Sequence, residues 1–255
     1  LYKQVTDVLF PVMLEYKKAG WNVPKVMYYL ASNDNDNTKY PSDLREVYNY
    51  FYATDTYKDL WFCPNGKPMI TRHEVASDEF LKTFDGGVYY DFFEFKTRQW
   101  PINDYKKDDG AAWMEFEYPQ YLHGDWLSVS VAQHYSVRFS DTEGTHGRGY
   151  GEATGNDHEN YGKGLNYQEQ WQTAFDYDEK GFNVKYAFIT GWNEWVAIKS
   201  AAALGQNNQY LNGKKRVYFV DTVNREYSRD IEMMKGGYGD NYYLQSFKNI
   251  RAFKY

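Results

Sequence analysis

The chain has 255 residues but a single cysteine, Cys63, so it can form neither an internal disulfide nor a zinc site built from cysteines. It also lacks an excess of basic residues, because 29 Lys and Arg stand against 35 Asp and Glu for a formal net charge of −6. This balance leaves no basic face of the kind that binds nucleic acid. No apolar run approaches the roughly 20 residues that a membrane-spanning helix needs. We therefore expect neither a nucleic-acid partner nor a membrane span.

Motifs for nucleotides and for serine esterases are also missing. No Gly-x-Gly-x-x-Gly follows a strand-like run and opens a helix, and there is no Gly-Lys-Ser/Thr phosphate loop and no Gly-x-Ser-x-Gly turn. His146, His158, Asp157 and Glu159 share one polar stretch but lack the spacing of a metal site. The sequence therefore predicts no cofactor and no metal.

Aromatic residues are abundant instead. They make up 20% of the chain, with 27 Tyr, 16 Phe and 8 Trp. We expect some of these rings to line a surface cleft, although tyrosines also suit the half-buried face of a strand. A length of 255 residues permits one sizeable core, so we expect a single domain spanning 1–255. Because the chain opens at Leu1 inside a helical pattern, we also expect it to be part of a longer protein.

Helical spacing of apolar residues alternates along the chain with short continuous apolar runs. The spacing predicts helices over 5–18, 41–52, 78–84, 166–175 and 242–253. The runs predict strands over 25–31, 69–74, 91–100, 113–118, 126–134 and 186–189. Between 140 and 164 lies a polar stretch without apolar periodicity, which is typical of a functional loop. The alternation itself is typical of an α/β protein with a parallel sheet.

The spacing of these strands matches the βα units of a (β/α)8 TIM-barrel-like fold. About six strands are predicted, whereas a closed barrel has eight. Two explanations stay open: either the first strands precede Leu1, or the sheet is open.

One strand-like run ends in a polar motif, Tyr186-Ala187-Phe188-Ile189-Thr190-Gly191-Trp192-Asn193-Glu194-Trp195. Gly191 allows the backbone to bend where the strand ends, and Glu194 then lies at the carboxyl end, where α/β barrels bind substrate. Indoles offer flat faces for sugar C–H groups and N–H donors for hydroxyls. The motif therefore indicates a carbohydrate site, and the alternative is a buried aromatic cluster around a satisfied Glu.

This motif, followed by Asp230-Ile231-Glu232 and Gly239-Asp240-Asn241-Tyr242-Tyr243-Leu244, resembles the C-terminal half of the barrel shared by glycoside hydrolase families 71 and 99. The chain is also similar to related bacterial proteins of polysaccharide gene clusters, which are often labelled glycosyltransferase-like. The likeness extends more loosely to Trp171 and Arg148-Gly149-Tyr150. It implies a (β/α) barrel, an exported protein and a carbohydrate substrate.

The resemblance also implies that Glu194 is the catalytic base. In family 99 a second Glu follows three residues later and acts as the acid, but Ala197 stands there in this chain. Three options follow: the acid comes from another strand end, the chemistry differs, or the site binds glycans without cutting them. The Ile-Glu of the family maps to Glu232, with Met233 in place of the usual Pro.

Glycoside hydrolysis needs a second carboxyl group with a raised pKa. Glu152 in the polar loop and Glu232 rank level as this acid, ahead of Glu74 and Glu94. Glu74 suits the role less, since cationic neighbours would lower its pKa.

Eight side chains are predicted to bind the sugar: Trp192, Asn193, Trp195, Trp100, Arg98, His134, Glu74 and Tyr150. Arg98 shares one face of its strand with Glu94 and Lys96, and that face points either into the barrel or outward to solvent. His134 is either a ligand-binding or a structural histidine. We expect a glycoside hydrolase acting on a poly- or oligosaccharide, with a non-catalytic glycan-binding barrel and a glycosyltransferase-like protein as the alternatives.

Overall fold

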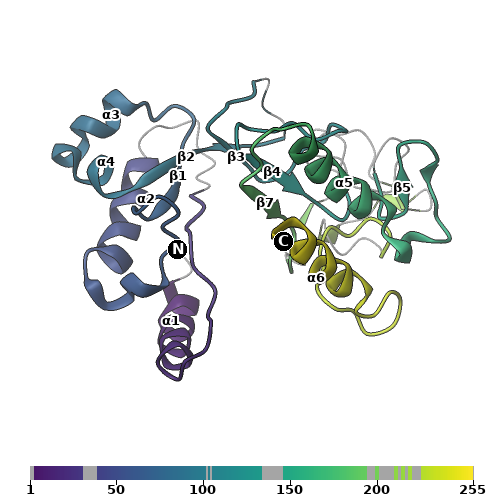
Figure 1. Cartoon of the computed structure of the whole chain (residues 1–255), viewed down its shortest axis with the longest axis horizontal. Helices are drawn as coiled ribbons and strands as arrows, with labels where there is room; N and C mark the ends of the chain where they lie inside the picture. The colour runs from purple at the N-terminus through teal and green to yellow at the C-terminus, as the bar shows by residue number, and fades with distance from the viewer. Residues whose placement is uncertain are drawn as a thin grey trace. The chain divides into compact units, whose positions relative to one another are not determined.

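The computed structural model describes residues 3–30, 39–101, 103, 105–133, 146–193, 199–200, 210–211, 214–215, 218–219 and 225–254 (Figure 1). The chain divides into two compact units, unit 1 (Leu1–Arg98) and unit 2 (Gln99–Tyr255). The boundary falls inside a strand rather than in a linker. A single domain over 1–255 stays a prediction.

Unit 1 contains mostly helices before a short parallel sheet. Its elements are α1 (Lys3–Lys18), α2 (Lys39–Val47), the π-helical turn η1 (Tyr48–Tyr52), the 3-10 helix η2 (Asp55–Leu60), β1 (Met69–Arg72), α3 (Asp78–Thr83), η3 (Phe84–Gly87), α4 (Val88–Phe92) and β2 (Glu94–Gln99). Ser77 caps α3, because its side chain accepts a hydrogen bond from the Phe80 N–H (3.2 Å).

The strands of unit 1 run parallel. β1 pairs with β2 in a register that places Met69 opposite Glu94 and Arg72 opposite Thr97. The predicted strand 25–31 contributes two isolated parallel bridges, Val26 to Trp61 and Tyr28 to Ile70. Parallel strands bring their carboxyl ends to one edge, so Arg72 and Arg98 both follow buried strand residues at that edge.

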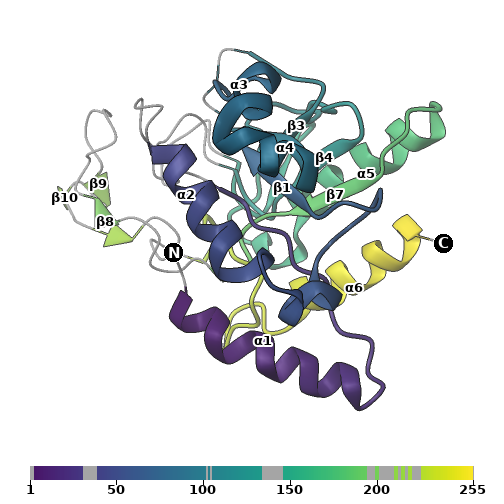
Figure 2. The same ribbon diagram turned by 90° about the vertical axis from the view of Figure 1, so that its left-hand side faces the viewer.

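Aromatic side chains form much of the core of unit 1. Phe10 of α1 contacts Phe51 and Trp61 edge-on, at ring-centroid distances of 5.6 and 5.5 Å. Tyr52 packs on both Trp61 and Phe93. Figure 2 shows the helices α1 and α2 that contribute to this unit. Many of the rings therefore stabilise the interior rather than lining a cleft.

Unit 2 contains a second parallel strand pair and two long helices. Its elements are β3 (Gly110–Ala112), β4 (Trp126–Val129), β5 (Tyr150–Gly151), β6 (Gly155–Asn156), the 3-10 helix η4 (Tyr161–Lys163), α5 (Leu165–Glu179), β7 (Tyr186–Ile189), β8 (Lys199–Ser200), β9 (Tyr210–Leu211), β10 (Lys214–Lys215), β11 (Tyr218–Phe219) and α6 (Asn241–Lys254). The last two antiparallel pairs are β9 with β10 and β8 with β11.

β4 and β7 form the parallel pair that positions the candidate site. Trp126 lies opposite Tyr186 and Val129 opposite Ile189. Helices α5 and α6 lie beside this pair (Figure 1) and pack on each other through Trp171 and Phe253. The core here includes the fully buried Leu127, Val129, Tyr167, Ile231 and Tyr242.

The five predicted helices are confirmed. Three strand predictions need correction, and one of them, 126–134, ends early, since β4 covers only Trp126–Val129. The predicted strand 113–118 is wrong: the strand is β3, whose residues Gly110–Ala112 are small and fully buried. The predicted strand 91–100 begins later, because Asp91 and Phe92 belong to α4. The error over 113–118 arises because bulky aromatic residues alternate with polar ones in irregular backbone as readily as in strands, and that over 91–100 because a short helix precedes the strand directly.

Parallel strands alternating with helices confirm the predicted α/β class. Within the ranges that the structure describes, no helix is long and apolar enough to cross a bilayer.

Candidate functional site

The candidate site lies at the carboxyl-end edge of β4 and β7, in unit 2. Because the two strands are parallel, Gln133 after β4 and Gly191–Asn193 after β7 leave the sheet at the same edge. Ligands of α/β proteins bind at this edge. Glu194, Trp195, Ala197 and His134 lie outside the described residues.

The turn after β7 brings an acidic candidate next to the motif. The Ile231 N–H donates to the Gly191 carbonyl (2.8 Å), and the Glu232 N–H donates to the Trp192 carbonyl (2.9 Å). Gly191 has a φ of +74°, and a Cβ on it would overlap the Arg229 carbonyl oxygen. Only glycine permits this approach. Glu232, which is half-buried, is thereby fixed beside Trp192.

Arg148 anchors the segment that carries Glu232. Its guanidinium is fully buried, donates from Nε to the Ser228 carbonyl (2.8 Å) and bonds the Asp230 carbonyl through Nη2. The same group stacks on the rings of Tyr238 and Tyr242 at 4.3 and 4.4 Å. The planar fork of arginine thus holds two backbone carbonyls at once. The sequence singled out Arg148 only through the resemblance.

Trp192 presents an open aromatic surface. Its side chain is 50% exposed and meets Tyr243 of α6 edge-on, with ring centroids 6.1 Å apart. Asn193, the next residue, is exposed as well. An exposed indole supported from one side is suited to stacking against a sugar ring.

Tyr150 and Glu152 lie together on the β5–β6 hairpin. The Tyr150 hydroxyl donates to the Glu152 carboxylate (3.1 Å), and burial, with the charge of Glu152 adding to it, raises the pKa of Tyr150. Glu152 is exposed, and its N–H donates to the Glu169 carboxylate (3.0 Å). The hairpin therefore presents Glu152 to solvent.

A buried polar network that sequence reasoning missed lies behind this edge. Gln133 donates from Nε2 to the Glu115 carbonyl, and its backbone forms a two-way bridge with His146. The Glu115 carboxylate is buried and binds His123 (2.7 Å from Nε2) and Lys106. The alternation of apolar and polar residues around Glu115 predicted a strand. No sequence pattern indicated a role for Gln133.

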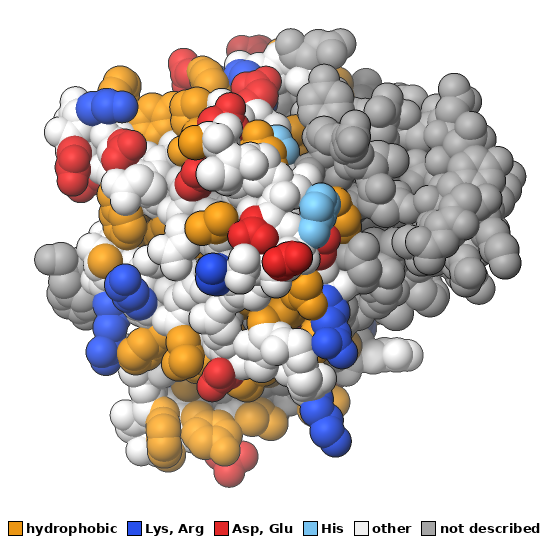
Figure 3. All heavy atoms as spheres, turned by 90° about the vertical axis from the view of Figure 1, so that its right-hand side faces the viewer, with side chains coloured by type: hydrophobic (Ala, Val, Ile, Leu, Met, Phe, Trp, Pro, Cys, Tyr) orange, Lys and Arg blue, Asp and Glu red, His pale blue; other side chains and the backbone are white. Residues whose placement is uncertain are grey.

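His158 lies on the exposed side of the same loop region. Its Nδ1 is 2.7 Å from the Glu226 carboxylate, and two thirds of its side chain is exposed. Figure 3 shows a histidine among acidic side chains on one face of the molecule. Within the described part of the chain, no group of three His, Cys, Asp or Glu side chains could hold a metal ion.

Trp100 is half-buried in unit 2. Its ring meets that of Trp113 at 5.7 Å, and the Arg229 guanidinium lies 5.0 Å from the Trp113 ring. Trp100 thus belongs to an aromatic and cationic cluster next to the segment that carries Glu232.

Two other predicted residues, Glu74 and Arg98, lie in unit 1. Arg98 is 3% exposed and donates from Nε to Glu74 (2.7 Å). Burial by itself would raise the pKa of Glu74, but the hydrogen bond and charge of Arg98, with His73, outweigh it and hold the pKa below its usual value. The pKa of Glu74 is thus lowered, in the direction expected from cationic neighbours, and the main cation is Arg98, which is distant in sequence. Lys96 is buried too, so a solvated face for this part of β2 is wrong.

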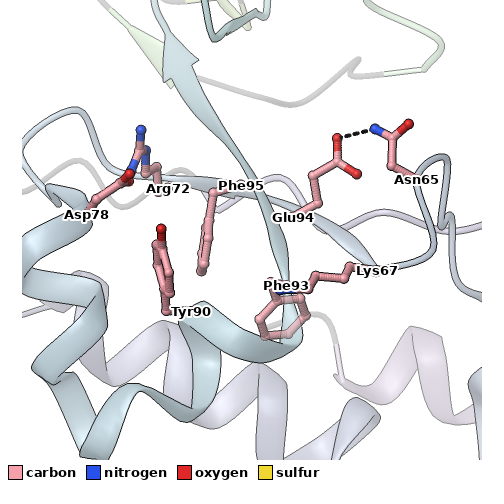
Figure 4. A pocket seen from close by; sticks show the side chains of 8 residues that line it. All are labelled: Asn65, Lys67, Arg72, Asp78, Tyr90, Phe93, Glu94 and Phe95. Atoms are coloured by element: carbon pink, nitrogen blue, oxygen red, sulfur yellow. Dashed lines mark hydrogen bonds and ion pairs between the residues drawn. The ribbon is translucent and has the colours of Figure 1, made fainter.

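A cavity of about 450 Å³ lies elsewhere in unit 1. Figure 4 shows the Arg72–Asp78 ion pair at one end and the Glu94–Asn65 hydrogen bond (2.8 Å) at the other. Tyr90, Phe93 and Phe95 lie between them, and Lys67 completes the lining. Apart from Glu94, one of the acids considered for catalysis, no predicted site residue lines this cavity.

Neither a family model, nor a curated protein, nor a solved structure matches the chain.

Proposed function

We propose that this chain is a glycoside hydrolase with a (β/α)8 barrel fold, whose substrate is a poly- or oligosaccharide and whose catalytic base is Glu194. The observation that carries the proposal is the edge of β4 and β7, where the exposed Trp192 and the half-buried Glu232 are joined through backbone hydrogen bonds. Glu194 follows Trp192 by two residues. Glycoside hydrolysis requires two carboxyl groups that flank the bound sugar, and we propose Glu194 and Glu232 for these roles.

Among the candidates for the acid, Glu232 has the best support. A general acid must be held in a fixed position from which it can reach the leaving oxygen. Glu232 is half-buried and fixed beside Trp192, whereas Glu152 is exposed on its hairpin. Glu74 has its pKa held low by Arg98, the wrong direction for an acid. In our proposal Glu232 protonates the leaving oxygen, and Trp192, Asn193 and Tyr150 contact the sugar.

The test compares three variants, Glu194→Gln, Glu232→Gln and Glu152→Gln. Wild type is incubated with starch, dextran, mannan, xylan and galactomannan, and released reducing ends are measured together with binding by calorimetry. We expect Glu194→Gln and Glu232→Gln each to lose at least about a hundredfold in kcat, the scale of general acid–base catalysis, while binding persists. Glu152→Gln should retain most of the turnover. Unchanged turnover in Glu194→Gln would refute the assignment.

The second candidate is a glycan-binding barrel without hydrolytic activity, which Ala197 favours because it replaces the acid of the family 99 motif. This function predicts binding by wild type and by Glu194→Gln alike, with no reducing ends released by either. A glycosyltransferase would instead be stabilised in melting temperature by a nucleotide sugar and not by free glycans.

A further inference from the structure

Gln133, which follows β4, forms a β-bridge with His146, which precedes the β5–β6 hairpin, and this bridge holds His146 in one defined protonation state. Gln133 and His146 exchange two backbone hydrogen bonds, of 2.7 Å from Gln133 N–H and 3.1 Å from His146 N–H. Gln133 is 1% exposed, so its side chain has little freedom to reorient. Its amide touches both Glu115 and His146.

The partners of Gln133 determine which way its amide points. The Glu115 carbonyl can only accept a hydrogen bond, so the Gln133 group that faces it is the NH₂. The Gln133 carbonyl oxygen then faces His146 Nδ1 at 2.8 Å, and this oxygen can also only accept. Nδ1 therefore carries the hydrogen. In the neutral imidazole the other nitrogen, Nε2, is left with its lone pair.

The surroundings of His146 keep the ring neutral. It lies flat on the Tyr150 ring, with centroids 3.7 Å apart and an interplanar angle of 6°. Burial lowers the pKa of His146, and the nearby Glu152 opposes this only in part. These two groups, Tyr150 and Glu152, are the titratable ones that the described residues place against the ring. At pH 7 the imidazole therefore remains an acceptor at Nε2.

His146 is half-buried, and no described residue forms a hydrogen bond with its Nε2. A tautomer fixed by a hydrogen bond at the other ring nitrogen is the arrangement that second-shell bonds give to functional histidines.

We propose that His146, held as the Nδ1–H tautomer by Gln133, binds the ligand by accepting a hydrogen bond at Nε2 from a sugar hydroxyl. This inference rests on the proposed function, because it takes the ligand at the edge of β4 and β7 to be a carbohydrate. Neutral hydroxyls are suited to the position, since each can donate to Nε2 and has further capacity to accept a hydrogen bond.

The first experiment measures the tautomer without any ligand. Imidazole nitrogen chemical shifts of His146 are recorded by NMR between pH 5 and pH 8, in wild type and in Gln133→Leu. We expect the Nδ1–H form in wild type, with protonation only below the usual histidine pKa of about 6.5. In Gln133→Leu this preference should weaken. An Nε2–H tautomer or a charged ring at pH 7 in wild type overturns the inference.

The second experiment uses a matched pair of substitutions. His146→Asn keeps a donor near the position of Nδ1 but removes the acceptor, whereas His146→Gln places an amide oxygen near the position of Nε2. With the polysaccharide that wild type cleaves, we expect KM to rise about fivefold in His146→Asn, the equivalent of one neutral hydrogen bond, and to recover in part in His146→Gln. We expect the KM of wild type to rise at acidic pH, because protonation of His146 removes the acceptor at Nε2, and this rise should be absent in His146→Asn.

The outcomes separate this inference from the proposed function. A His146→Asn variant with the KM and pH profile of wild type overturns the role of His146 while leaving hydrolysis intact. If wild type and Glu194→Gln release no reducing ends, the hydrolase proposal fails, and calorimetry with the same five polysaccharides decides the inference. Equal affinity of wild type and His146→Asn overturns it, and so does an absence of binding by wild type to all five.

Discussion

At the scale of the residue, the clearest electrostatic consequence concerns Glu74 and Arg98 in unit 1. Arg98 is almost fully buried, and Glu74 is its carboxylate partner. Removing one member of a buried pair leaves the other charge without compensation, which costs more than the pair contributes. Glu74 is therefore assigned to stability rather than to acid catalysis.

We expect Glu74→Gln to lower the free energy of unfolding by about 3 kcal/mol at pH 7. Because the pKa of Glu74 is lowered by folding, this stabilisation is complete above the ordinary Glu pKa of about 4.3 and is lost as the pH falls through the lower pKa of the folded state. Urea unfolding of wild type and variant at pH 3 to 7 measures the difference, which should shrink toward low pH.

The control for this prediction is Glu117→Gln. Glu117 is 68% exposed and lies 3.9 Å from Lys106, so its loss should change stability by no more than about 0.5 kcal/mol. If the difference in free energy of unfolding between wild type and Glu74→Gln stays constant from pH 3 to pH 7, the electrostatic explanation is contradicted.

At the scale of the element, the turn after β7 shows how one backbone position arranges a site. Two hydrogen bonds to Gly191 and Trp192 align the segment from Arg229 to Glu232 along the strand end. The arrangement requires both a positive φ and the absence of a Cβ at Gly191. The position of the segment that carries Glu232 therefore depends on a residue that has no side chain.

We expect Gly191→Ala to destabilise the chain by more than about 2 kcal/mol and to reduce turnover. The left-handed conformation costs an L-residue about 1 to 2 kcal/mol, and the clash with the Arg229 carbonyl adds to it. Gly181→Ala is the matched control, because Gly181 has a φ of +85° and a Cβ there would meet nothing within 4 Å. Urea midpoints and kcat/KM check both variants, and equal losses would show that the clash contributes nothing.

At the scale of the whole molecule, the boundary between the two units lies within β2 and not in a linker. Residues of β2 pair with β1 in unit 1, and its last residue, Gln99, accepts a hydrogen bond from the Trp113 N–H (3.1 Å) in unit 2. A strand that is continuous across a boundary couples the folding of its two ends.

We therefore expect one cooperative unfolding transition for residues 1–255. Glu74→Gln in unit 1 and Gly191→Ala in unit 2 should each shift that same transition in differential scanning calorimetry. Two separate transitions, each sensitive to only one of the substitutions, would show that the units are independent domains.

The sequence predicted elements better than contacts. Periodicity of 3.6 located α1, α5 and α6, and α1 ends at Lys18, shortly before Gly20, which adopts a positive φ. The apolar run before Gly191 identified β7. The strand predicted over 113–118 failed because the small residues of β3 carry no hydrophobic pattern.

By itself, the sequence determined the α/β alternation and the polar ends of β4 and β7, because burial periodicity is a local property. Only the tertiary structure decided that Glu232 lies beside Trp192, that Arg98 is buried, and that Gln133 fixes the tautomer of His146. Arg148 reaches Ser228 across 80 residues of sequence. Such contacts depend on how strand ends converge in space, and no local pattern records that convergence.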